Sequence, residues 1–168
     1  MSRHSYSLVA EPSGSSYVAL LEAGFAHSSF CHLVIPPFVR GSPSERELQS
    51  VVGVSPVSIE QVTKWPGTEL YAGRTAVLMR FPCEAKLLEK LVRCTDHLYG
   101  WEAPALPEDL GFTRADGSVW LGTITHEREG FMSLSLEEHS ALLSRHPILV
   151  PVVAGTPDFS DTKNDGWA

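Results

Sequence analysis

The spacing of apolar and polar residues predicts several short strands interspersed with four helices. The most regular helical pattern lies between Glu84 and Leu98, where leucines recur at three- and four-residue intervals and charged residues occupy the opposite face. Gly100 follows this segment as a stop signal. We therefore expect a helix over 84–98 that buries Leu87, Leu91 and Leu98 against a sheet.

Three further helices are expected. Residues 15–27 are rich in apolar residues, although Gly24 weakens the helical pattern and leaves a strand as the alternative. Two other segments carry the signature of a capping box, with a serine at the N-cap and a glutamate three residues later. The first begins at Ser42 and the second at Ser135, and Pro147 prevents the second helix from continuing.

The strands are shorter, and turn residues bound most of them. The expected strands cover residues 6–10, 30–35, 59–65, 75–81, 112–114, 119–125, 131–134 and 148–153. Asp116-Gly117 is a strong hairpin signal between two of them. The three strands from 112 to 134 therefore predict a meander. The fold class expected is α+β: a two-layer structure in which three to four helices pack on an antiparallel sheet containing this three-stranded meander.

The length of 168 residues fits one domain. We expect this domain to cover residues 1–155, followed by a polar, acidic tail over 156–168 that contains three aspartates.

The charge balance limits the classes of partner. The chain has 13 basic and 20 acidic residues, which gives a formal net charge of -7. This balance opposes binding to nucleic acid or to an anionic membrane surface, and it favours a basic protein partner. The alternative is that the acidic surface serves only solubility.

The sequence also predicts a soluble, cytoplasmic protein. It contains no run of about 18 apolar residues that would cross a membrane, and residues 1–9 lack the apolar core of a secretory signal. Three cysteines without a CxxC spacing suit a reducing compartment.

One residue pair has the composition of an acid–base catalyst. His126 and Glu127 follow a predicted strand at the start of a turn, where functional residues often lie. They do not form an HExxH zinc motif, because Gly130 occupies the place of the second histidine. The alternative is a turn that satisfies its own polar groups.

The cysteines give weaker candidates. Cys31 cannot pair with His32, because adjacent strand residues point to opposite faces. Cys94 and His97 have the spacing of half a zinc site, but no second pair of ligands is evident. We therefore expect no metal and no cofactor.

Aromatic and acidic residues are the candidate partner-binding positions. Trp65 and Trp101 lie at the edges of predicted elements, where a tryptophan can anchor an interface or close the end of the core. Asp116, Glu127 and Glu129 lie in the two turns of the expected meander.

Four segments resemble small bacterial proteins. They are WPGT at 65–68, LYGWEAPALPEDLGF at 98–112, RADGSVWL at 114–121 and THE at 125–127. The proteins concerned are common in high-GC soil bacteria, and some are similar to immunity-type proteins of toxin systems. The resemblance implies a bacterial, cytoplasmic, single-domain protein and assigns no activity.

The leading hypothesis is therefore a protein-binding domain, such as an immunity protein or another stoichiometric inhibitor. The second is a small enzyme that uses His126 and Glu127. The third is a structural or adaptor component whose exposed aromatic residues dock into a larger assembly.

Overall fold

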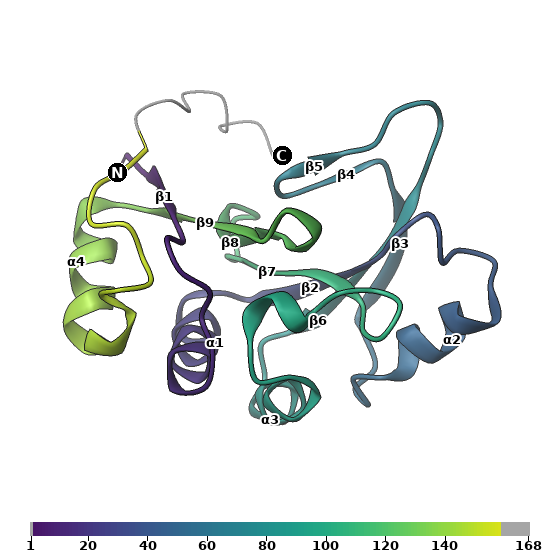
Figure 1. The fold of residues 1–168 in the computed structure, drawn as a ribbon, viewed down its shortest axis with the longest axis horizontal. Helices are drawn as coiled ribbons and strands as arrows, with labels where there is room; N and C mark the ends of the chain where they lie inside the picture. The colour runs from purple at the N-terminus through teal and green to yellow at the C-terminus, as the bar shows by residue number, and fades with distance from the viewer. Residues whose placement is uncertain (1, 159–168) are drawn as a thin grey trace.

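The computed structural model describes residues 2–158, which form nine strands and four α-helices (Figure 1). The strands are β1 (His4–Ser7), β2 (Phe30–Ile35), β3 (Ser58–Val62), β4 (Lys64–Trp65), β5 (Thr68–Glu69), β6 (Ala76–Pro82), β7 (Glu108–Thr113), β8 (Val119–Ile124) and β9 (Glu129–Leu134). The α-helices are α1 (Ser15–His27), α2 (Pro43–Ser50), α3 (Ala85–Cys94) and α4 (Leu136–Arg145). Three short 3-10 helices are η1 (Leu98–Gly100), η2 (Thr125–Glu127) and η3 (Pro147–Leu149).

Seven strands form one sheet with the order β1-β9-β8-β7-β2-β6-β3, and every pairing between them is antiparallel. The prediction of an α+β fold with an antiparallel sheet is confirmed at this level. Strand β1 forms one edge of the sheet, although its outer side is covered by a later segment of the chain. There, the backbone N–H groups of Ala154 and Asp158 donate to the carbonyls of Ser7 and Ser5.

Helices α1 and α3 lie on one face of the sheet and enclose the main core (Figure 1). Leu20 and Leu21 of α1 and Leu87 and Leu91 of α3 are buried there. Full burial of a leucine contributes about 1.5–3 kcal/mol relative to exposure. The apolar stripe expected along residues 84–98 therefore does face the interior.

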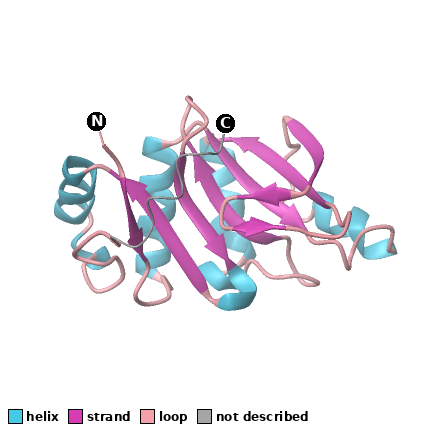
Figure 2. Cartoon of the chain, turned by 90° about the horizontal axis from the view of Figure 1, so that it is seen from above, coloured by secondary structure: helices cyan, strands magenta, loops and turns pink. Residues whose placement is uncertain are grey.

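A second, smaller core lies on the opposite face of the sheet. The two-stranded hairpin β4–β5 folds over this face, as the views in Figures 1 and 2 show. Its Trp65 packs with Val34, Ala76 and Leu78, which belong to the neighbouring strands β2 and β6. The hairpin is thus attached to the sheet by an apolar contact, and this attachment shapes the candidate site.

Several local predictions are confirmed. The boundaries of α1 and β2 are as expected, so the Gly24 position did not prevent a helix. The capping box at α4 is complete: Ser135 Oγ accepts from the Glu138 N–H at 3.1 Å, and a Glu138 carboxylate oxygen accepts from the Ser135 N–H at 2.7 Å. The Asp116-Gly117 turn links β7 to β8, and Gly117 adopts a φ of 83°.

The strand expected over 148–153 is wrong. Residues Pro147–Leu149 form η3, and the N–H groups of Val150, Val152 and Val153 donate to carbonyls three or four residues earlier. Because Pro147 and Pro151 have no N–H group, a regular ladder is unfavourable here. This segment pairs with another part of the chain at one isolated antiparallel bridge, between Leu8 and Val153.

Other element boundaries also differ from the expectation. Helix α3 ends at Cys94, because Thr95 is extended. The Ser42 side chain does not cap α2: its hydroxyl donates to the Val39 carbonyl, and Glu45 accepts from the Gly41 N–H instead. Of the expected tail, residue 158 is held against β1, and residues 159–168 lie outside the described residues. No helix in the described part combines the length and apolar character needed to cross a bilayer.

Candidate functional site

The two predicted tryptophan anchors are inside the protein. Trp65 is 4% exposed and Trp101 is fully buried. The Trp101 indole N–H donates to the Tyr17 hydroxyl at 2.9 Å, within the main core. The core-packing alternative therefore describes both residues in this structure, and neither ring is available to a partner without opening the core.

Trp65 leads to a carboxylate that sequence reasoning missed. Its indole N–H donates to Asp109 Oδ2 at 2.7 Å, and the Thr125 backbone N–H donates to Asp109 Oδ1 at the same distance. Asp109 is 1% exposed, so both of its oxygens are satisfied away from water. The carboxylate thus joins the β4–β5 hairpin, strand β7 and the turn η2.

A bulge places a second carboxylate beside the first. Between β2 and β7 the register shifts, so that Asp109 and Leu110 together oppose Leu33. Asp109 takes a left-handed conformation with a φ of 54°. In a regular strand, Glu108 and Asp109 would point to opposite faces, but a bulge removes this alternation. Both acids therefore lie at the base of the hairpin.

Glu108 is the most perturbed acid of this pair. Its side chain is 7% exposed, and burial raises its pKa to about 7. The neighbouring charge of Asp109 raises this pKa further, while the Ala103 N–H and His126 oppose the shift. Burial also raises the pKa of Asp109, against the hydrogen bonds from Thr125 and Trp65. A buried carboxyl that titrates near neutrality is typical of proton-transfer sites.

His126 and Glu127 lie at the surface above this pair. His126 Nε2 and Glu127 Oε1 are 3.7 Å apart, and both side chains are more than half exposed. Because His126 interacts electrostatically with both Glu108 and Asp109, the predicted acid–base pair adjoins the buried carboxylates. The backbone returns from η2 through Arg128, which has a φ of 56° and donates to Glu11 at 2.6 Å.

An open groove runs beside the same hairpin, and we call it the hairpin groove. Its volume is about 570 Å³. One wall is formed by the hairpin and the other by β1, β8 and β9, and its lining residues are Ser5, Ser7, Leu8, Gly67, Thr68, Glu69, Ile124, Glu129, Gly130, Phe131 and Asp158. Three of these are acidic and none is basic. The predicted residue Glu129 is one of them.

Asp116 is separated from the other predicted acids. It lies in the turn between β7 and β8, at the far end of β8 from η2. Its carboxylate accepts from the Ser118 N–H and hydroxyl, which lower its pKa, and it lies 3.6 Å from Arg3. A six-residue strand spans roughly 20 Å, so Asp116 and Glu129 do not form one site.

The cysteine candidates are not placed for chemistry. Burial raises the pKa of Cys31 well above its usual value and also raises that of Cys94, which opposes thiolate formation. His97 Nδ1 lies 2.8 Å from an Asp96 oxygen. Within residues 2–158, no group of three or more His, Cys, Asp or Glu side chains is arranged to hold a metal ion.

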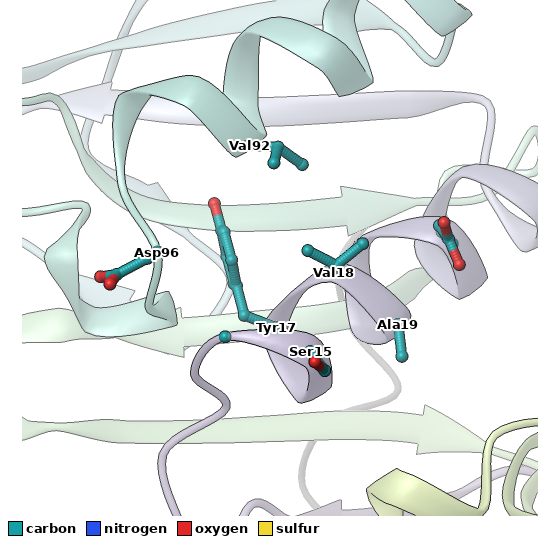
Figure 3. Close-up of a pocket in the computed structure, with 8 residues that line it drawn as sticks. Ser15, Tyr17, Val18, Ala19, Val92 and Asp96 are labelled. Atoms are coloured by element: carbon teal, nitrogen blue, oxygen red, sulfur yellow. The ribbon is translucent and has the colours of Figure 1, made fainter.

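A second hollow lies between α1 and α3 (Figure 3). Tyr17 stands in it with its hydroxyl toward α3, beside Val18 and Val92. That hydroxyl accepts from Trp101 and donates to the Leu91 carbonyl at 3.4 Å, and burial raises its pKa. Because its central polar group already has partners within the core, this hollow is a weaker candidate than the hairpin groove.

The chain matches no protein-family model, no curated protein and no solved structure. The sequence contained one usable signal for the missed residues, since Pro107-Glu108-Asp109 puts two acids directly before an apolar strand segment. Glu69 and Asp158 gave no such signal, because only the folded chain brings them beside Glu129.

Proposed function

We propose that this chain is a protein-binding domain whose hairpin groove receives a basic segment of a partner, in the manner of an immunity protein or another stoichiometric inhibitor. The observation that carries the proposal is the charge of the groove, which is lined by Glu69, Glu129 and Asp158 without a basic residue. The net charge of -7 adds long-range attraction for a basic partner.

The shape of the groove supports a lysine or arginine side chain as the recognised group. Ile124 and Phe131 offer apolar contact for the aliphatic stem of such a residue, and Glu129 offers a carboxylate for its cationic end. The volume of about 570 Å³ suits one or two side chains of a partner rather than a folded element. A bacterial, cytoplasmic setting is part of the same proposal and is supported by the sequence resemblance.

Charge reversal tests this proposal. Binding of a short arginine-rich peptide would be measured by titration calorimetry for the wild type, Glu129→Lys and Glu47→Lys. Glu47 is exposed on α2 and does not line the groove, so its reversal changes net charge equally. We expect Glu129→Lys to weaken binding about tenfold or more and Glu47→Lys to have a small effect. Equal losses would show non-specific attraction and would refute the proposal.

Acid–base catalysis is a second candidate, and the buried Glu108 is the specific observation that favours it. With a pKa of about 7, this carboxyl can both accept and donate a proton at neutral pH. His126 lies nearer to solvent and could exchange that proton with a substrate. Turnover of ester, amide or phosphoester probes should then fall roughly 10²–10⁴-fold in Glu108→Gln. Turnover that is unchanged in this variant, or absent from the wild type, would reject the candidate.

A further inference from the structure

The two edges of the seven-stranded sheet differ in how they are covered. At one edge, residues 152–158 run along β1: Val9 N–H donates to the Val152 carbonyl, and Ser7 Oγ donates to Asp158 at 2.6 Å. At the other edge is β3, which lies at the opposite end of the sheet in Figure 1. Within residues 2–158, β3 pairs with β6 and with no other strand. One row of its backbone groups therefore faces outward.

Strand β3 carries few of the features that usually protect an edge. Its five residues contain no proline or lysine and one charged residue, and its length is close to that of an average strand. Ile59 is 52% exposed, and Val57, just before the strand, is 60% exposed. An edge with unpaired backbone groups and exposed apolar side chains favours the addition of another strand.

The side chains of β3 define the chemistry of that added strand. Ile59 pairs with Met79 and points to the helix side of the sheet, whereas Glu60 pairs with Leu78 and points to the other face. Glu60 is the one charged residue of β3 and is exposed. A complementary strand would place an apolar residue against Ile59 and a basic residue against Glu60.

We propose that β3 is a docking edge for an extended segment of a protein partner in which apolar and basic residues alternate. This surface lies on a different strand from the hairpin groove, and the proposal does not require the groove to bind anything. Main-chain hydrogen bonds supply the affinity, while Ile59 and Glu60 supply the selectivity.

The probe is a short capped peptide in which Val and Lys alternate, and the readout is the exchange and chemical shift of the β3 amides by NMR. Binding should slow amide exchange along β3. A peptide with the same side chains but with N-methyl groups on alternate residues loses hydrogen bonds, so it should bind about tenfold more weakly or worse. Equal binding of the two peptides would overturn strand addition.

Reversal of the charge at Glu60 tests whether the added strand is recognised by its basic residues. Followed at the β3 amides, Glu60→Lys should weaken binding of the Val/Lys peptide about tenfold and strengthen binding of a Val/Glu peptide. Glu137→Lys makes the same charge change at an exposed position of α4 that lines neither the groove nor β3, so it should leave both unchanged. Because the β3 amides report on this edge alone, peptide bound in the groove does not affect the result. A Glu60→Lys variant that binds both peptides at β3 as the wild type does would overturn the proposal. So would a dimer of the free protein that dissociates in Ile59→Lys, because the occupant of the edge would then be a second copy.

Discussion

The indole N–H of Trp65 donates to Asp109 across 2.7 Å, and this bond ties the β4–β5 hairpin to the bulge in β7. Both residues are buried, so neither the donor nor the acceptor has water as a substitute partner. The hairpin forms one wall of the hairpin groove. The shape of that groove therefore depends on a hydrogen bond that lies beneath it.

Removal of the indole N–H donor should lower the free energy of unfolding more at Trp65 than at Trp101. Trp65→Phe leaves one oxygen of a buried carboxylate unsatisfied, which should lower the free energy of unfolding by about 2–3 kcal/mol beyond the lost apolar area. Trp101→Phe leaves the neutral Tyr17 hydroxyl, which keeps its bond to the Leu91 carbonyl. Loss of the indole donor in Trp101→Phe should therefore lower the free energy of unfolding by about 0.5–1.5 kcal/mol. Urea unfolding of both variants measures the difference, and equal losses would contradict this account of Asp109.

Glu108 should make the protein less stable as pH rises toward 7. Its pKa is about 7 in the folded state and near the ordinary 4.5 in the unfolded chain. Between these values the folded state holds more protons, so raising the pH favours unfolding. The effect is on the order of 3 kcal/mol and is complete above pH 7. Glu108→Gln should abolish this contribution; a stability difference between wild type and variant that does not change with pH would exclude it.

His32 should make the protein less stable as the pH falls, which is the opposite of the effect of Glu108. Burial, together with the charge of Arg80, lowers its pKa to about 4 from the ordinary 6.5. The unfolded chain then binds the extra proton between pH 6.5 and 4, so stability is lost as the pH falls through that range. Because Nε2 has no partner among the described residues, His32→Leu should remove this loss without a large cost at pH 8. Thermal melting of both proteins from pH 4.5 to 8 measures this loss of stability. If His32→Leu loses as much stability at low pH as the wild type, protonation of His32 is not the cause.

Leu91 tests the contact between α3 and the core. It is fully buried, so Leu91→Ala should lower the free energy of unfolding by about 2–5 kcal/mol. Leu136 lies at the start of α4 and is 63% exposed. Leu136→Ala should therefore change the free energy of unfolding by less than about 0.5 kcal/mol. Chemical denaturation of both variants gives the comparison. A cost at Leu91 no larger than at Leu136 would rule out the packing described for α3.

Much of the fold could be predicted because its signals are local. Helix α3 follows from the leucine spacing, α4 from its capping box, and the β7–β8 turn from Asp116-Gly117. The failures involve information that is not local. Residues 148–153 have the composition of a strand, but their backbone bonds close short turns instead.

The candidate site was harder to predict for the same reason. His126, Glu127 and Glu129 follow from the position of a turn, and they do lie near the proposed sites. The alternation rule for strands would have separated Glu108 from Asp109, and the bulge that joins them depends on pairing with β2. Exposure of Trp65 and Trp101 likewise cannot be judged from their places at element edges, because distant strands and helices cover them.

The position of β1 beside β9 sets an order for events during protein synthesis. The residues of β1 are translated before those of β9, and the paired residues His4↔Leu134 and Ser7↔Phe131 are separated by well over a hundred positions. The segment that covers the outer side of β1 is translated later still. Strand β1 therefore has no strand to pair with in the sheet until β9 has left the ribosome. Elements β2, β6 and α3 can assemble before that point. Pairings of such long range are slow to form, so the closing of this edge is expected to be a late step of folding.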